Sequence, residues 1–590
     1  MKYIFVWAYT LLSLVGFSQS YNFKKHEVFY IPSEPAFISI NLKSPSNTSE
    51  NIISYLEKNY LNTSVSEQKL ELESVKSSPL GKHYRYKHIF KNMPVFHSFI
   101  QANYDNNGQL FMIINNLAQF DGYEIPSFSI SHGNFWMNTN YGLTPAYVKE
   151  KFDSSKNQSA LYYYNNEDKL IFSYNPKLYF QNPDSMVSAM VYLPNPIVAT
   201  NATYGDKGFV DNNDKDSPEL TNARSKVRVP LKFENGKFKL TNRLISLKNL
   251  HDPVGNPVEP VDTFLNYTRS QPGFEDINAY YHIYSYSNYL RKIGFESLLD
   301  SIIIDPHGAN GDDNSFFDPQ QYPYEIEYGT GGVDDAEDGQ VVIHEFGHSL
   351  STIASFGTQN GNERLAMEEG QADYVCMSYS RSLSKNKPNL VFSWDGHNEI
   401  WDGFKTNTLG KYEDLSGIKD VDRELWSTAL MCIHDKLRST KSDSLVFSSY
   451  FLQAGGGTMP QMAKVILKLD SMLFNAKDLG KIWQCFTDRG ILDTVPGPIG
   501  IKEIENIDGH IKFLNTSDFS RGLSPSRILV TYPQLWNRIE IYNNLGQLTH
   551  TLKISKETTL RPDEFKSGVY YLKIISTNGE NIFSQKIIKF

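Results

Sequence analysis

Between Asp338 and Ala354 the chain reads DGQVVIHEFGHSLSTIA. Apolar residues recur in this segment at three- and four-residue spacing, which predicts an α-helix. Acidic residues from Asp334 onward precede it, and negative charge suits the positive end of a helix. His344 and His348 are one helical turn apart, so they lie on the same face. The segment therefore predicts a partly buried helix that presents two imidazoles side by side.

The same segment carries the residue types of a catalytic metal centre. His344 and His348 can bind one Zn²⁺ together, and Glu345 between them can take a proton from a zinc-bound water. A catalytic zinc needs a third protein ligand, which Glu369 can supply from a second predicted helix. Asp373, one turn after Glu369, can accept the free N–H of a zinc-bound histidine. The alternatives are a solvated helix face for these carboxylates and a structural zinc, although structural zinc favours cysteine-rich sites.

The two motifs together resemble those of the thermolysin and fungalysin superfamily of zinc metallopeptidases, with the fungalysin-like branch closer. A third segment, Asn314 to Phe317, looks like the edge-strand segment of that family, which implies that Asn314 binds the substrate backbone. The resemblance covers most of residues 70–495. It implies a thermolysin-like α+β catalytic domain with a mainly helical C-terminal half, preceded by an inhibitory propeptide. The implied activity is that of a secreted endopeptidase, made as a zymogen, that hydrolyses protein or peptide substrates with Glu345 as the general base.

One position departs from the family pattern. The family usually has a histidine six residues before a tryptophan, and the residue at that distance from Trp426 is Asp420. His397, Lys405 and Arg423 are candidates to replace the donor that is lost. The departure leaves open an alternative function, that of a zinc-binding but catalytically impaired surface adhesin or binding protein.

Changes in sequence pattern along the chain predict a multidomain α+β protein. Alternating apolar and polar residues from His83 to Phe90 and from Phe96 to Tyr104, followed by a turn at Asp105 to Gly108, predict a β-rich N-terminal region. Apolar residues at helical spacing then predict one helix that begins near Asp276 and further helices at 338–354, 366–381, 423–437 and 459–473. The predicted boundaries are a signal peptide at 1–20, a propeptide at 21–185, a catalytic domain at 186–495, a linker at 496–512 and a C-terminal β-sandwich at 513–590.

The two ends of the chain suggest export. Lys2, an apolar run from Tyr3 to Phe17 and small residues after it are the parts of a secretory signal peptide, with a buried N-terminal helix as the alternative. No later run reaches 18 apolar residues, so no transmembrane span is expected. The last 75 or so residues, notably 539–547, 565–571 and 586–590, resemble the C-terminal sorting module of the type IX secretion pathway of Bacteroidetes-type bacteria. That resemblance implies the secretion machinery as a partner and a final location outside a Gram-negative cell or on its surface, reached through the periplasm. An ordinary accessory β-domain is the alternative.

Composition excludes further classes of protein. Among 590 residues, 40% are hydrophobic and 13% aromatic, which excludes a largely disordered chain. Lys and Arg number 57 against 66 Asp and Glu, and the resulting net charge of −9 argues against a nucleic-acid-binding protein. Cys376, Cys432 and Cys485 have apolar neighbours, so buried free thiols are expected, with at most one disulfide. The acidic stretch from Asp211 to Asp216 could hold Ca²⁺, although a solvated loop is the preferred interpretation.

Overall fold

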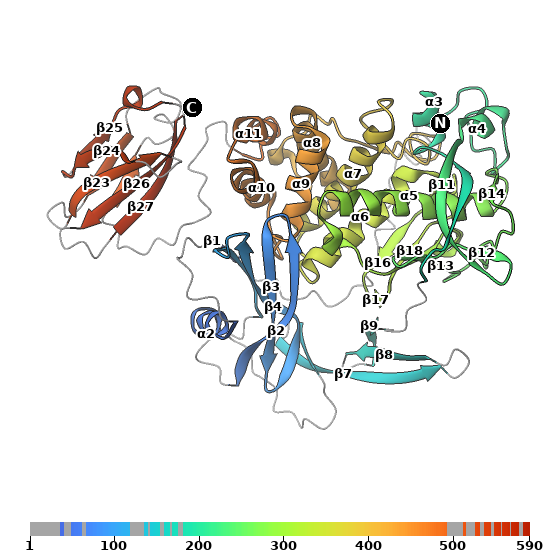
Figure 1. Ribbon diagram of the computed structural model, residues 1–590, viewed down its shortest axis with the longest axis horizontal. Helices are drawn as coiled ribbons and strands as arrows, with labels where there is room; N and C mark the ends of the chain where they lie inside the picture. Colours follow the sequence, from blue (N-terminus) through green and yellow to red (C-terminus); the bar gives the residue numbers. More distant parts are fainter. Residues whose placement is uncertain are drawn as a thin grey trace, which may run out of the picture.

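The computed structural model describes residues 36–39, 49–61, 67–118, 135–139, 142–153, 158–165, 168–174 and 181–492, and the ranges 511–514, 526–530, 536–543, 548–555, 557–566, 568–576 and 582–589 near the C-terminus (Figure 1). The predicted signal peptide and most of the predicted linker lie outside these ranges. The fold is mixed α+β, with 35% helix and 29% strand, and this confirms the expected class. Among the described residues, no helix combines the length and the apolar character needed to cross a membrane.

The N-terminal region is β-rich, as predicted. Its strands belong to a sheet with the order β1-β5-β4-β6-β7-β8-β9-β17, and β2 extends it through β3. The two alternating segments form β3 and β4, and β5 returns antiparallel to β4 after the expected turn at Asp105 to Gly108. The elements are β1 (Ala36–Ser39), α2 (Ser49–Tyr60), β2 (Gln68–Ser78), β3 (Gly81–Phe90), β4 (Met93–Asp105), β5 (Leu110–Asn116), β6 (Phe135–Thr139), β7 (Gly142–Asp153), β8 (Gln158–Tyr164) and β9 (Leu170–Tyr174).

Two four-stranded sheets open the central region. The first has the order β12-β11-β10-β14 and the second β13-β15-β18-β16, so β16 is the last strand of its sheet. Phe317 of β16 lies opposite Ile326 of β18, and both side chains join the main hydrophobic core. The strands are β10 (Ser185–Val191), β11 (Ser225–Glu234), β12 (Lys237–Lys239), β13 (Ile245–Leu247), β14 (Phe264–Leu265), β15 (Ile302–Asp305), β16 (Phe316–Asp318), β17 (Gln321–Tyr322) and β18 (Tyr324–Glu327).

The rest of the central region is mainly helical. All predicted helices are present, as α5 (Gly273–Lys292), α6 (Gly339–Ser355), α7 (Asn362–Leu383), α8 (Lys419–Lys436) and α10 (Met459–Phe474). The structure adds α3 (Pro196–Thr200), α4 (Pro218–Ala223), α9 (Ser439–Tyr450), α11 (Leu479–Thr487) and the short strands β19 (Leu390–Val391) and β20 (Phe404–Lys405). Phe346 of α6, Trp426 of α8 and Phe486 of α11 belong to the same buried core as the two sheets. This shared core fixes α6 relative to the sheet that ends in β16.

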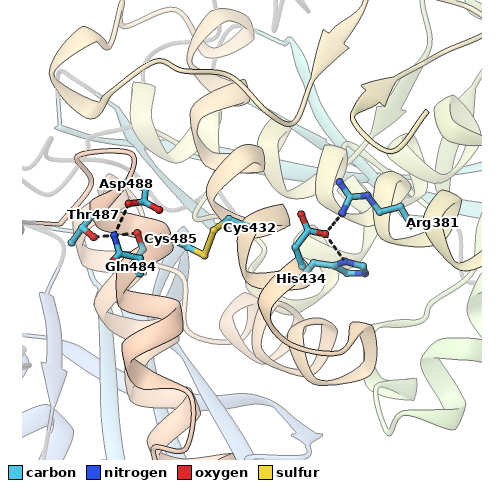
Figure 2. Close-up of a disulfide and its surroundings, with 8 residues drawn as sticks. Arg381, Cys432, His434, Gln484, Cys485, Thr487 and Asp488 are labelled. Carbon is cyan, nitrogen blue, oxygen red and sulfur yellow. Dashed lines mark hydrogen bonds and ion pairs between the residues drawn. A yellow bond between two sulfur atoms is a disulfide. The ribbon is translucent and has the colours of Figure 1, made fainter. Parts of the chain in front are cut away.

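The cysteines correct one expectation. Cys432 of α8 and Cys485 of α11 form a disulfide, with Cα atoms 5.7 Å apart, while Cys376 is a buried free thiol (Figure 2). The prediction of three free thiols is therefore wrong for two of them. Its failure has a physical reason: the two cysteines are 53 residues apart, and only the packing of α8 against α11 brings them together. A cross-link that closes a loop of this length contributes about 4 kcal/mol in the chain-entropy account.

The C-terminal strands form a β unit with its own core. One sheet has the order β21-β22-β25 and the other β24-β23-β26-β27. Ile528 and Leu560 of the first sheet pack with Ile539, Ile541 and Leu572 of the second in a cluster separate from the main core. The strands are β21 (Ile511–Leu514), β22 (Ser526–Val530), β23 (Trp536–Asn543), β24 (Leu548–Lys553), β25 (Glu557–Leu560), β26 (Gly568–Ser576) and β27 (Ile582–Lys589). These strands agree with the β structure predicted for 513–590, although parts of that range lie outside the described residues.

Candidate metal centre

Helix α6 holds the two histidines in a buried setting. The Asp338 side chain caps its N-terminus by accepting a hydrogen bond from the backbone N–H of Gln340 at 2.8 Å. One turn separates His344 from His348, and their Nε2 atoms are 3.2 Å apart. The carboxylate of Glu345 belongs to the same group, in which one ligand atom of each residue lies within 4.8 Å of the others. Both metal-ligand histidines expected from the sequence therefore point to one place, with the expected base beside them.

Two glycines let the neighbouring helices approach this group closely. A Cβ atom at Gly347 of α6 would lie 3.1 Å from Cα of Ala372 on α7. A Cβ atom at Gly370 of α7 would lie 2.7 Å from the carbonyl oxygen of Arg423 on α8. Because larger residues would force these backbones apart, the glycines allow Glu369 to reach the histidines from α7.

The third expected ligand completes a triangle of the size that zinc requires. Glu369 Oε2 lies 3.4 Å from His344 Nε2 and 3.6 Å from His348 Nε2. Zinc bonds of about 2.0–2.1 Å in a tetrahedron place any two ligand atoms about 3.3–3.4 Å apart. The three edges of 3.2, 3.4 and 3.6 Å are close to that value. The donor set of two imidazoles and one carboxylate also matches a catalytic zinc site, so these residues fit the metal.

Acidic residues contact the outer nitrogens of both histidines. Asp373 Oδ1 is 3.2 Å from His344 Nδ1, so the carboxylate lies beside the histidine that it was expected to contact. Glu368 Oε1 is 3.8 Å from His348 Nδ1, and the other oxygen of Glu368 accepts hydrogen bonds from Ser351 and Arg364. No role for Glu368 was predicted from the sequence, although its place next to Glu369 was the available signal. These contacts orient each ring so that Nε2 faces the triangle.

Two cations on α8 fix the carboxylates of α7. Lys419 Nζ is 2.6 Å from Glu369 Oε1, so the second oxygen, Oε2, is the one that faces the histidines. Arg423 binds Asp373 through two nitrogens and lies 3.3 Å from Glu369 Oε2. Burial would raise the pKa of Asp373, but the Arg423 guanidinium and the His344 imidazole together outweigh it and hold that pKa below its usual value. Lys419 was missed in the sequence, where its only signal was a spacing of one helical turn before Arg423.

The residues proposed as replacement donors are not equivalent in the structure. His397 Nε2 lies 3.1 and 3.2 Å from the backbone oxygens of Val391 and Phe404, and Lys405 is exposed. Arg423 alone among the three candidates contacts the ligand triangle, where its Nη2 is 3.2 Å from His344 Nε2. Asp420, which stands in place of the family histidine, is 43% exposed and pairs with Lys419 at 3.2 Å.

Asn314, the residue expected to bind substrate, is exposed and precedes the edge strand β16. Helix α6 packs against that strand. The acidic stretch from Asp211 to Asp216, considered as a calcium site, has protein partners in the structure. Arg269 pairs with Asp211 at 2.7 Å and with Asp214 at 3.3 Å. Asp216 accepts hydrogen bonds from Thr268 and Ser270. Protein donors thus engage at least one oxygen of each of these three aspartates.

No protein-family model matches this chain, and no curated protein matches it significantly.

Proposed function

We propose that the chain is a secreted zinc-dependent endopeptidase made as a zymogen, with a thermolysin-like catalytic domain at about residues 186–495. The observation that carries the proposal is the triangle of His344, His348 and Glu369, whose edges match a tetrahedral zinc, with the Glu345 carboxylate within 4.8 Å of a ring nitrogen of each histidine. A purely structural zinc site would favour a closed set of cysteines, and these ligands are imidazoles and a carboxylate.

Each residue of the centre has a chemical task in peptide hydrolysis. Zinc, when bound, supplies Lewis acidity that lowers the pKa of a water molecule and polarises the scissile carbonyl. Glu345 accepts a proton from the attacking water and delivers it to the nitrogen of the leaving amine as the C–N bond breaks. Asp373, 3.2 Å from His344 Nδ1, would hold the proton on that nitrogen, so that the Nε2 lone pair of His344 is available. Glu368, 3.8 Å from His348 Nδ1, supplies negative charge on the same side of the second ring. Asn314, which precedes the edge strand β16, would hold the substrate backbone.

The alternative is a zinc-binding protein that binds surfaces but does not hydrolyse peptides. Asp420 is the observation that favours it, because the loss of one transition-state donor typically costs 10²–10³-fold in rate. Cleavage of casein by the purified mature protein separates the two functions. A zinc endopeptidase should degrade casein, and a chelator should abolish the degradation. An adhesin should carry zinc and leave casein intact.

Residues 21–185, proposed as the propeptide, contact the helices around the metal centre. Gln101 of β4 donates a hydrogen bond to the backbone oxygen of Phe451 at 2.7 Å, and His83 of β3 stacks on the Phe451 ring. Lys76 of β2 donates to the backbone oxygen of Ile353 near the end of α6, and β9 pairs with β17. These contacts support a zymogen in which the N-terminal region packs against the end of the zinc-binding helix. In Figure 1, β3 and β4 extend toward α9 and α10.

His83 should make this contact sensitive to acid. Burial lowers its pKa to about 4, whereas an unfolded histidine has a pKa of about 6.5. The unfolded chain therefore binds the proton first, and stability that is complete above pH 6.5 is lost as the pH falls toward 4, by about 3 kcal/mol from this group. His83→Gln should remove that share of the pH dependence of unfolding in urea. If the free energy of unfolding falls equally between pH 7 and pH 4 in the variant and in the wild-type zymogen, the role of His83 is contradicted.

The C-terminal β unit is proposed as an address read by type IX secretion machinery. Its separate core indicates that it folds without the catalytic region. A chain that ends near Gly500 should therefore remain folded and bind zinc, but should accumulate in the periplasm of its host. Cell fractionation followed by immunoblotting measures this. If the truncated chain reaches the medium as efficiently as the full chain, the unit serves another role, such as binding to substrate or to a surface.

A further inference from the structure

The side chain of Lys419 lies at a partly exposed edge of the metal centre. Its Nζ is 2.6 Å from Glu369 Oε1, while the other oxygen of Glu369 faces the two histidines. A single carboxylate therefore separates the ammonium from the ligand triangle. The Lys419 side chain is 26% exposed, against 5% for Arg423. Of the two cations on α8 that contact Glu369, Lys419 is thus the one that a substrate can reach from solvent.

Arg423, the other cation, is fully engaged by the protein. Its Nε and Nη2 donate hydrogen bonds to Asp373, and its Nη1 lies 3.3 Å from Glu369 Oε2. The guanidinium also lies over the Phe404 ring, 4.0 Å from its centre. Because all three nitrogens have protein partners, Arg423 could turn toward a substrate only by releasing Asp373. Arg423 is therefore a positioning residue for the carboxylates of α7.

The Lys419 ammonium has a donor that these contacts do not use. It carries three N–H bonds. Within the described part of the chain, its hydrogen-bond and ion-pair partners are two carboxylates, Glu369 at 2.6 Å and Asp420 at 3.2 Å. The third N–H can therefore point at a substrate atom. Helix stability does not account for a lysine here, because Lys419 is the first residue of α8, where the helix dipole disfavours a cation.

We propose that Lys419 is a catalytic residue that stabilises the carbonyl oxygen of the scissile peptide bond, a role that rests on the peptidase function proposed above. When the water oxygen bonds to the carbonyl carbon, the π electron pair of C=O moves onto the carbonyl oxygen, and Glu345 takes the proton of the water. Lys419 donates a hydrogen bond to the negative oxygen and keeps its own proton. As the C–N bond breaks, the electron pair returns to form C=O, and Glu345 passes its proton to the leaving nitrogen.

The fixed position of the ammonium is what makes a large effect possible. Glu369 and Asp420 hold Nζ before any substrate arrives, so little reorganisation is needed when the oxygen becomes negative. The donor acts on charge that exists only during the reaction, so it should lower the barrier without strengthening the binding of the substrate itself.

Kinetics and inhibitor binding test this role, with the mature protein held at saturating zinc. Lys419→Met, which keeps the length of the side chain and removes the ammonium, should still bind one zinc per chain. Its kcat on a fluorogenic peptide should fall by about 10²–10³-fold. KM should change little, because the lost interaction is made only in the transition state. A phosphinic peptide, which has a tetrahedral P–O⁻ group in place of the scissile bond, should bind more weakly by a similar factor.

Two further variants serve as controls. Lys419→Arg restores a cationic donor and should recover part of both losses. Lys436→Met, at an exposed lysine near the other end of α8, should match the wild type in zinc content, kcat and phosphinate affinity. If Lys419→Met does not fold, as judged by thermal unfolding, Lys419→Gln replaces it.

A merely structural role gives a different pattern. If Lys419 only positions Glu369, Lys419→Met should bind zinc more weakly but regain the wild-type kcat and phosphinate affinity once zinc is saturating, and that result would overturn the proposal. Equal kcat in the wild type and in Lys419→Met would overturn it too and leave the peptidase function standing. If the wild type itself hydrolyses no peptide, the peptidase function fails, and the role of Lys419 fails with it.

Discussion

Replacement of Glu345 by glutamine should leave one zinc per chain and reduce peptide hydrolysis by about 10²–10⁴-fold, the usual contribution of a general base. Glutamine has nearly the same shape as glutamate and is not one of the three proposed ligands, so the metal stays. It cannot accept the proton of the attacking water, so the chemical step slows. Zinc content by elemental analysis and kcat/KM on a fluorogenic peptide measure the two effects separately.

A matched control is Glu413→Gln, which makes the same change at an exposed glutamate. That variant should match the wild type in both measurements. If Glu345→Gln keeps its activity within tenfold of the wild type, Glu345 is not the base and the mechanism proposed here is wrong.

Replacement of Glu369 by alanine should remove zinc from the protein altogether. Glu369 supplies the third corner of the ligand triangle, and the side chains that hold it, Lys419 and Arg423, are positive and cannot replace it as ligands. Asp373→Ala should instead weaken zinc binding by about 10–100-fold, because it only releases the orientation of His344. Zinc affinity measured in competition with a fluorescent chelator distinguishes the two effects.

The order of these two effects is the informative result. If Glu369→Ala keeps its full zinc content, the third ligand is a different residue. Should Asp373→Ala lose zinc as completely as Glu369→Ala, Asp373 would be a ligand rather than a support for His344.

Helical periodicity was enough to predict α6, α7, α8 and α10, because each buries apolar residues at regular spacing. Helix α9 was missed because its serines obscure the apolar pattern, and packing between neighbouring helices decides its conformation. The disulfide between α8 and α11 was missed because it also depends on how these helices pack against each other. Within the candidate site, residues on one helix were predicted from spacing alone, as His344 and His348 show.

Contacts between helices were harder to predict. The roles of Glu368 and Lys419 depend on how closely α7 lies to α6 and α8, and that distance follows from Gly347 and Gly370. Spacing within an element is local information, whereas these groups depend on the packed fold.

The central claim is that one zinc, held by His344, His348 and Glu369, serves peptide hydrolysis. The most direct test is the rate of casein hydrolysis by the mature protein after its metal has been removed and zinc is returned in measured amounts. The rate should be negligible without metal, rise in proportion to added zinc and level off at one equivalent per chain. A rate that survives metal removal, or a protein that takes up one equivalent of zinc and still leaves casein intact, would contradict the claim.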